Sequence, residues 1–256
     1  ETVMKDVENI NAYLVGAADV IVKTKSKPTD GRPEFISGNV ADDDGALIAK
    51  SKEEFGSFSE DASRLIKPFV GSSKFINGRP RYCLWVEDED LELAMTQDDF
   101  VRRFDKVRRK RSSLNSGPRA KGAVNTPHKF AFRSNRDRSA IVIPRVTSEN
   151  RPFLPVGIVD GEIILGDRNF ALYDAPLWNM AIIASKLHWV WIGTVCVRLE
   201  MRFSYSNTLG WNTFPVPTLT EKNKLDLTRC AEDILLAREK HFPATIADLY
   251  KSEAMP

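Results

Sequence analysis

The longest apolar stretch of the chain, residues 175–197 (APLWNMAIIASKLHWVWIGTVCV), places the tightest constraint on the fold. It predicts a long helix toward Leu199, and because the stretch is apolar nearly all round, that helix belongs in a core. Asn179, Lys186 and His188 interrupt its centre. A charge there would cost about 2.5 to 3.5 kcal/mol inside a bilayer. We therefore predict a buried core helix and not a membrane span.

Short runs with strand character precede this helix. Residues 81–86 follow a turn and alternate in character, and five more runs lie within residues 128–174: HKFAFR, SAIVIPRV, FLPVGIV, GEIIL and FALYD. The turn residues between these runs predict an antiparallel meander. Thr218 and Glu221 predict a capping box for a final amphipathic helix through about Lys240. The sequence therefore predicts an α+β fold with a mixed or antiparallel sheet, a buried core helix and C-terminal helices.

The chain divides into three segments by composition. Residues 1–50 are rich in turn residues (SKPTDGRPEF, ADDDGAL) and are expected to form a linker wrapped on a domain. Residues 51–217 hold the predicted core and sheet, and residues 218–256 are expected to form a helical extension. The sequence begins on Glu1 and not on Met, which suggests a piece of a longer protein.

Charge is segregated along the chain. Residues 100–151 hold fifteen Lys or Arg and three acids, a local charge of +12, although the whole chain carries only +2. The remainder therefore carries −10. A basic middle in an acidic frame is typical of a protein that presents one face to a polyanion, and nucleic acid is the commonest such partner. The alternative is a solvated helix face with no ligand.

The most basic segment has a helical pattern. Phe100, Phe104, Val107 and Leu114 fall near helical spacing, while seven of residues 102–111 are basic. One stripe is expected to pack, and the rest of the helix to face a polyanion. A flexible basic loop is expected to follow at SGPRAKG. The residues predicted to contact backbone phosphates, which give affinity with little sequence information, are Arg102, Arg103, Lys106, Arg109, Lys110, Arg111, Lys121 and Arg151.

Catalytic and metal-binding motifs are missing from the sequence. It contains no Walker loop, no GxGxxG, no GxSxG and no acid two residues before a lysine, as restriction-type nucleases show. The cysteines and histidines are scattered, so they favour a reducing cytoplasm and predict neither disulfides nor a metal site. They are Cys83, Cys196, Cys230, His128, His188 and His241. We predict no catalytic residue and no metal in this segment.

Two polar segments carry side chains that can read base edges. The first is a predicted hairpin turn at residues 145–151, and the second is the ribbon EMRFSYSN at residues 200–207. Alternation along the ribbon predicts that Met201, Phe203 and Tyr205 anchor it to the core. Taken singly, these residues fit ordinary turns or a surface ion pair. The predicted base-reading residues are Glu200, Arg202, Ser204, Ser206, Asn207, Arg145, Ser148 and Asn150.

Four blocks of sequence resemble a known family. RLIKPFVGSSKFINGRPRYCLWV, IPRVTSENRPFLPVGIV, SKLHWVWIGTVCVRLEMRFSYSNTLGWNTFPVP and IADLYKSEAMP, in this order, resemble the target-recognition region of single-chain type IIG/IIL restriction-modification enzymes. These are adenine-specific DNA methyltransferases. The resemblance implies that the acid-x-base pair Glu200 and Arg202 reads the base beside the target adenine. It therefore implies a C directly 3′ of that adenine, and a G where a basic-x-acid pair stands instead.

The catalytic motifs of that family are absent here. No Asn/Asp-Pro-Pro loop occurs, NTPH at residues 125–128 is no substitute, and the glycine-rich cofactor loop is missing. The resemblance therefore implies a recognition fragment whose first 50 residues lead out of a catalytic domain. It also implies double-stranded DNA and the catalytic domains of a bacterial cytoplasmic parent as partners. S-adenosylmethionine would serve the parent, with no cofactor in this segment. Two alternatives stay open: a type I specificity subunit, and a non-enzymatic nucleic-acid-binding module.

Overall fold

The chain folds around three small sheets, shown in a computed structural model that describes residues 4–12, 14, 16–134, 138–251 and 253. The central sheet is antiparallel and has the order β1-β9-β5-β7. Its strands are β1 (Ile36–Ser37), β9 (Asn169–Tyr173), β5 (Ala140–Pro144) and β7 (Gly157–Val159). All five residues of β5 are buried, as expected for a strand with neighbours on both sides.

The second sheet has the order β2-β4-β3-β8. Its strands are β2 (Ile48–Ala49), β4 (Arg81–Leu84), β3 (Ile66–Val70) and β8 (Ile164–Leu165). Strand β4 confirms the strand predicted there, and β8 joins β3 in parallel. The third sheet has the order β10-β11-β6, with β10 (Arg198–Leu199), β11 (Arg202–Ser204) and β6 (Val146–Thr147).

The predicted meander is wrong, although the mixed α+β fold class is confirmed. Consecutive runs go to three different sheets: β5, β7 and β9 to the central one, β6 to the third and β8 to the second. The run at residues 128–133 forms only an isolated bridge, Val40 to Phe132. Strands β1 and β2 come from the stretch predicted as a linker and pair with β9 and β4. The exact domain limits remain a prediction.

The apolar stretch lies in the core, as predicted, but it forms two helices instead of one. Helices α5 (Trp178–Ala184) and α6 (Lys186–Val195) meet at Ser185, whose backbone is extended. The Ser185 hydroxyl accepts a hydrogen bond from the His188 backbone N–H and so caps α6. Met180, Ile183 and Ile192 are buried in the main core beneath the central sheet. No helix in the described parts of the chain is long and apolar enough to cross a membrane.

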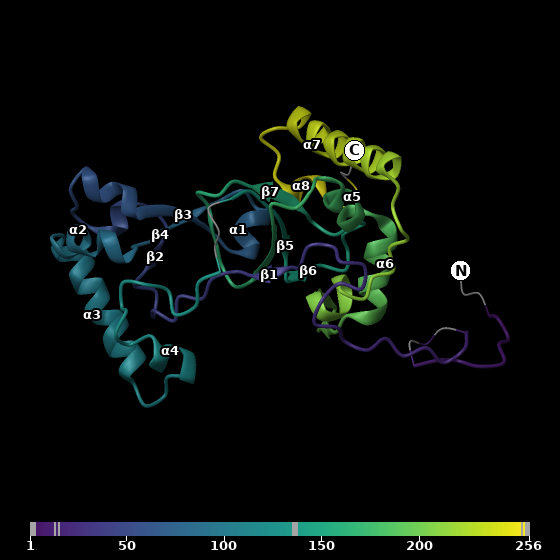
Figure 1. Cartoon of the computed structure of the whole chain (residues 1–256), viewed down its shortest axis with the longest axis horizontal. Helices are drawn as coiled ribbons and strands as arrows, with labels where there is room; N and C mark the ends of the chain where they lie inside the picture. The colour runs from purple at the N-terminus through teal and green to yellow at the C-terminus, as the bar shows by residue number, and fades with distance from the viewer. Residues whose placement is uncertain (1–3, 13, 15, 135–137, 252, 254–256) are drawn as a thin grey trace.

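The C-terminal helices close the main core. Helix α7 (Glu221–Lys240) begins slightly later than predicted, because Thr220 and not Thr218 forms the capping box, together with Asn223. It lies along α5 and buries Ala231 against the core (Figure 1). Helix α8 (Ile246–Leu249) follows beneath it.

The helical part of the basic segment, α3 and α4, lies at the opposite end of the molecule, while its strands lie at the centre (Figure 1). Helix α3 (Asp98–Ser112) confirms the predicted basic helix and buries Phe100, Phe104 and Val107 in a second core. Leu114, the fourth residue of the predicted apolar stripe, does not pack, because it lies beyond the end of the helix and is 93% exposed. The predicted basic loop after it is instead a short helix, started by Pro118. The remaining helical segments are α1 (Ser72–Ile76), α2 (Leu91–Met95), α4 (Pro118–Gly122) and the 3-10 turns Glu53–Phe55, Asp61–Leu65 and Asp88–Asp90.

Candidate nucleic-acid interface

The ribbon at residues 200–207 is a tight hairpin followed by an irregular turn. Strands β10 and β11 pair Arg198 with Phe203 and Leu199 with Arg202, so Glu200 and Met201 form the two-residue connection. Glu200 adopts a left-handed backbone, φ 57°, which costs a residue with a Cβ about 1 kcal/mol. The hairpin, which we call the recognition hairpin (residues 198–204), therefore presents its connection outward.

The predicted anchors of the recognition hairpin are only partly correct. Phe203 and Tyr205 are buried, with Tyr205 3% exposed, so both confirm the prediction. Met201 does not, because it is 64% exposed. The simple alternation fails at this position because the chain reverses there instead of continuing as a strand. Met201 therefore sits at the outer end of the hairpin beside the charged pair.

Glu200 and Arg202 form an exposed ion pair. The Arg202 guanidinium donates to the Glu200 carboxylate at 2.7 Å, and the Arg202 and Glu200 side chains are 49% and 76% exposed. Such an exposed pair adds little stability, typically under about 1 kcal/mol. The pair thus places an acceptor and a donor side by side at the tip of a solvent-facing turn.

The structure brings the second polar segment against the recognition hairpin. Strand β6 pairs with β11, placing Val146 opposite Ser204 and Thr147 opposite Phe203. The Tyr205 backbone N–H also donates to the Arg145 carbonyl at 2.7 Å. Two segments far apart in the sequence thus form one three-stranded unit, which we call the recognition sheet (β6, β10 and β11).

The polar side chains of the 145–151 turn differ in their exposure to solvent and in their contacts with the rest of the protein. The Arg145 guanidinium lies over the Phe170 ring at 4.9 Å and reaches the Asp167 carbonyl at 3.3 Å. The Ser148 hydroxyl accepts from the Asn150 backbone N–H, which leaves the Asn150 side chain exposed. Arg151 is half-buried and donates to the Thr147 hydroxyl at 3.2 Å. Burial lowers the pKa of Arg151.

The end of the ribbon turns inward. The Ser206 and Thr208 hydroxyls are hydrogen-bonded at 2.9 Å. Asn207 begins a π-helical turn, Asn207–Trp211, and its side-chain amide donates to the Phe35 carbonyl at 3.3 Å. Asn207 therefore supports the fold, while Glu200 and Arg202 face solvent.

A buried, uncharged pair supports the recognition hairpin from behind. The His188 Nε2 and the Tyr205 hydroxyl are hydrogen-bonded at 3.0 Å, and neither residue reaches solvent appreciably. Burial, with a smaller contribution from the nearby Arg32 cation, lowers the pKa of His188 to about 3. Burial also raises the pKa of Tyr205. Both side chains are therefore neutral near pH 7.

Most cations of α3 are engaged within the fold. Arg102 pairs with Asp99 at 2.5 Å, and Lys106 donates to the Asp44 carbonyl at 2.9 Å. Arg103 donates to the Ala46 carbonyl at 2.7 Å and to the Glu54 carbonyl. On α4, Lys121 donates to the Leu114 carbonyl at 3.2 Å, though its side chain stays exposed.

Two α3 cations point to solvent without a protein partner. Arg109 and Lys110 are exposed, and within the described residues neither side chain has a hydrogen bond or an ion pair. Arg136 and Asp137, which the charge count of the basic segment includes, lie outside the described residues. Only part of the local +12 is therefore presented at the surface.

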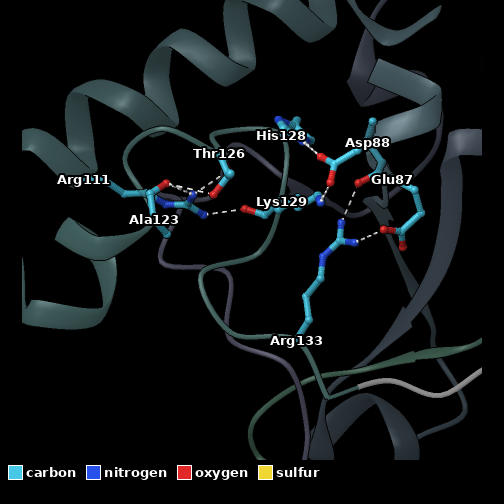
Figure 2. Close-up of polar contacts among 9 residues, drawn as sticks. Glu87, Asp88, Arg111, Ala123, Thr126, His128, Lys129 and Arg133 are labelled. Atoms are coloured by element: carbon cyan, nitrogen blue, oxygen red, sulfur yellow. Dashed lines mark hydrogen bonds and ion pairs between the residues drawn. The ribbon is translucent and has the colours of Figure 1, made fainter. Parts of the chain in front are cut away.

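Arg111 does not fit the predicted role of a phosphate contact. Its side chain is 0% exposed, and Figure 2 shows it pointing into a ring of backbone carbonyls. Burial lowers the pKa of Arg111. Because its donors are occupied and it lacks access to solvent, Arg111 leaves the set of predicted DNA contacts. The carbonyl acceptors are those of Ala41 (2.7 Å), Asp42 (3.2 Å), Ala123 (2.9 Å), Thr126 (3.0 Å) and Lys129 (2.7 Å).

A neighbouring ion cluster holds the loop after α4 in place (Figure 2). Asp88 bonds Lys129 at 2.5 Å and His128 at 3.2 Å, and these hydrogen bonds lower the pKa of Asp88. Arg133 donates to Glu87 at 2.7 Å, and its guanidinium lies over the Trp85 ring. These cations therefore also serve the fold.

Comparison with known proteins places the chain in a family. The sequence model of the family described as "MmeI, target recognition domain" matches residues 16–218. The chain belongs to the MmeI target recognition domain family.

Two relatives match over nearly the whole chain. DNA methyltransferase A of Bacillus subtilis (strain 168) is 32% identical over 254 residues, which is 98% of this chain and 29% of that protein. A solved structure of the type IIL restriction-modification enzyme MmeI in complex with DNA is 31% identical and has a TM-score of 0.92. That match covers 98% of this chain and 34% of the MmeI chain. The chain thus spans about a third of the length of these relatives.

Within this MmeI-family domain, sequence reasoning missed several cations, of which Arg168 and Arg198 are exposed and Lys74 and Arg81 are half-buried. Arg198 in β10 lies over the Phe203 ring at 4.5 Å. Lys74, Arg81 and Arg168 lie together beside β6, although they are distant in sequence and all fall outside the basic segment. No local pattern marks such a group, because helix α1, strand β4 and the β8–β9 turn each supply one cation.

Proposed function

We propose that this chain is the part of an adenine-N6 DNA methyltransferase that recognises a double-stranded DNA sequence, within a type IIL restriction-modification enzyme. The observation that carries the proposal is the recognition sheet, which holds an exposed acid-base pair in a chain of the MmeI target recognition domain family. The relatives support it, since one is named a DNA methyltransferase and the other was solved in complex with DNA.

The geometry of the Glu200 and Arg202 pair suits one C·G base pair. In the major groove, cytosine presents the N4 donor directly beside the O6 acceptor of its paired guanine. A carboxylate and a guanidinium held 2.7 Å apart offer the complementary acceptor and donor side by side. Glu200 would accept from cytosine N4, and Arg202 would donate to guanine O6 and N7. We propose that this cytosine lies directly 3′ of the methylated adenine.

The other polar residues divide into two proposed roles. Ser204 lies on the recognition sheet, and Ser206, Arg145, Ser148 and Asn150 follow or precede its strands; these residues would contact neighbouring bases. Arg109 and Lys110, with Arg102, Arg103, Lys106, Lys121 and Arg151 at their exposed atoms, would neutralise backbone phosphates. Asn207 is turned inward and would act only by supporting the ribbon.

The chemical step would belong to the rest of the parent chain. Flipping of the adenine and methyl transfer from S-adenosylmethionine need motifs that this sequence lacks. Residues 1–50 would connect the catalytic part to the recognition domain at residues 51–217, and residues 218–256 would extend it. We propose a bacterial cytoplasmic enzyme that is bound to the nucleoid while it acts.

A charge-reversal experiment tests the proposal. The double variant Glu200→Lys with Arg202→Asp, made in the full-length protein, should change the base 3′ of the methylated adenine from C to G. Sequencing-based mapping of methylated adenines in cells that express each protein gives the readout. The matched control reverses another exposed pair, Asp226→Arg with Arg229→Asp on α7, and should keep the original site. The proposal is contradicted if the unmodified protein methylates no adenine. It is also contradicted if the Glu200→Lys, Arg202→Asp variant still methylates the original sequence.

A further inference from the structure

A cationic hollow lies beside the recognition sheet. Its lining comes from the start of α1, the first residue of β4, the turn between β8 and β9, and strand β6. The residues that matter for its chemistry are Ser72, Ser73, Lys74, Arg81, Val146 and Arg168. Three of these six are cations and none is an acid. Such a group of like charges is unfavourable unless an anion neutralises it.

Two of the three cations of the hollow, Lys74 and Arg81, lack counter-charges from the described residues. Within the described residues, neither Lys74 nor Arg81 makes a side-chain hydrogen bond or ion pair, and the buried Nε of Arg81 has no acceptor. The nearest acid to Arg168 is Asp167, at 4.0 Å. A buried guanidinium N–H without a partner is costly, because such groups are almost always hydrogen-bonded in native proteins. The Arg81 Nε thus lies without an acceptor beside the half-buried Lys74.

The hollow is built rigidly. The Arg81 guanidinium lies over the Phe69 ring at 5.2 Å. It also lies close to Gly71, because a Cβ added to Gly71 would be 3.8 Å from the terminal nitrogen of Arg81. The Ser72 hydroxyl donates to the Arg168 carbonyl and ties α1 to the β8–β9 turn. Arg81 is thus held against the wall of the hollow and keeps little freedom to swing into solvent.

Backbone hydrogen bonds connect the hollow to the recognition hairpin. The Arg168 carbonyl that accepts from Ser72 also accepts from the Arg145 backbone N–H, at 2.8 Å. The Arg145 carbonyl in turn accepts from the Tyr205 N–H at 2.7 Å. These hydrogen bonds fix the hollow relative to the recognition hairpin. The position of an anion bound in the hollow would therefore determine where the hairpin lies relative to that anion.

We infer that Lys74 and Arg81 bind one phosphodiester group of the DNA backbone and thereby set the register of the recognition sheet on the duplex. The inference rests on the proposed function. Contacts to phosphate position a protein on DNA, while contacts to bases specify the sequence. A tetrahedral phosphate suits a site with one guanidinium and one ammonium group, since arginine supplies directed donors and lysine a point charge.

The hollow extends the basic surface along α1. Lys74 also lines an adjoining depression with Arg79, and the acid there, Asp248, already binds Thr245 and Lys251. No acid is among the described residues that line the hollow beside β6. The bound phosphate is therefore expected to belong to the strand that passes the recognition sheet.

Binding measurements on the full-length protein test the inference. We expect Lys74→Gln with Arg81→Gln to lower affinity about tenfold for a cognate and for a scrambled duplex alike, and to reduce the slope of log Kd against log salt by about one. The control Lys222→Gln, an exposed cation on α7, should leave both quantities unchanged. If the double variant loses affinity only for the cognate duplex, these residues read bases and the inference fails.

Neutral linkages identify the phosphate. In a series of duplexes, a single neutral methylphosphonate replaces the phosphate at successive positions. One of these replacements should weaken DNA binding by the unmodified protein but leave binding by the double variant unchanged. If no position behaves this way, the inference fails, whereas an unmodified protein that binds no DNA at all contradicts the proposed function instead. Because Arg81→Gln touches a packed ring, Lys74→Gln alone and Arg81→Lys provide variants that keep the wall intact. A different result would overturn the inference: inorganic phosphate stabilises the unmodified protein but not Lys74→Gln, and the two proteins bind DNA equally well. The hollow would then be a site for a free anion.

Discussion

Helix α3 and the recognition hairpin both carry arginines, but they use them in opposite ways. On α3, Arg103 and Arg111 point back onto carbonyl groups of the surrounding loops. On the hairpin, Arg202 faces solvent and its guanidinium bonds only Glu200 among the described residues. The more basic region therefore uses much of its charge to hold its own fold, while the less basic one leaves an acid-base pair free to bind. Density of charge in the sequence is therefore a poor measure of how many charged side chains are left free of contacts within the fold.

The contrast has a physical origin in backbone hydrogen bonding. The loops around α3 have little regular structure, so their carbonyl groups need donors from side chains. Arginine supplies five N–H donors in a fixed geometry and serves several carbonyls at once. The hairpin satisfies its own backbone through β10, β11 and β6. Glu200 and Arg202 are therefore released from that task, although Arg198 donates to the Met201 carbonyl at 3.3 Å.

The largest expected effect is on the stability of the α3 region. Arg111→Met removes one hydrogen-bond donor from each of five buried or partly buried carbonyl groups. We expect the free energy of unfolding to fall by about 3 to 5 kcal/mol. Arg109→Met, two residues earlier and exposed, should change it by less than about 0.5 kcal/mol. Urea denaturation of both variants gives the measurement. Equal effects would mean that Arg111 is not a structural residue, and the contrast between the two regions would disappear.

Acid should weaken the support of the recognition hairpin. The pKa of His188 is about 3 in the folded protein and about 6.5 when unfolded, so only the unfolded chain gains this proton between these values. Stability is therefore fully present above about pH 6.5 and is lost as the pH falls toward 3, by up to about 1.4 kcal/mol per pH unit. His188→Gln should remove this contribution to the slope in pH-dependent denaturation. The control His241→Gln, at an exposed position after α7, should keep the same dependence of unfolding free energy on pH as the unmodified protein. If His188→Gln also keeps that dependence, the prediction is wrong.

Single changes at the hairpin tip should separate binding from stability. Arg202→Gln removes the proposed donor to guanine, and we expect discrimination at that base pair to fall by about 1 to 3 kcal/mol. The free energy of unfolding should change by less than about 0.5 kcal/mol, because the pair is exposed. Competition binding with duplexes that differ at one base pair measures the first quantity and urea denaturation the second. A loss of stability without a loss of discrimination would make the pair structural.

The smallest expected effect belongs to the free cations of α3. Arg109→Gln with Lys110→Gln should weaken binding several-fold for every duplex and reduce the salt slope by about 0.9 for each phosphate that the variant no longer neutralises. Lys240→Gln at the end of α7 serves as the control. Fluorescence anisotropy at several salt concentrations gives both values. An unchanged salt slope would mean that Arg109 and Lys110 of α3 take no part in binding. The DNA contacts would then be confined to residues outside α3.

Local sequence patterns predicted much of the fold because they act over short distances. The apolar stripe of α3 and the capped final helix follow from side-chain spacing alone, and both are present. The break at Ser185 was missed, since the hydroxyl that caps α6 lies inside a continuous apolar run. Strand partners were also missed, because β6 and β8 pair with strands that are remote in sequence.

For the candidate site, the sequence by itself determined which residues were available. It predicted two polar segments, a basic helix and an absence of catalytic motifs, and its blocks resembled the recognition region of a family to which the chain belongs. Only the tertiary structure decided their use. It joined the two segments in one sheet, buried Arg111, turned Met201 outward and gathered Lys74 and Arg81 beside β6. The reason is that exposure of a side chain depends on acceptors and surfaces supplied by distant residues, as the Arg111 bonds to Ala41 and Lys129 illustrate.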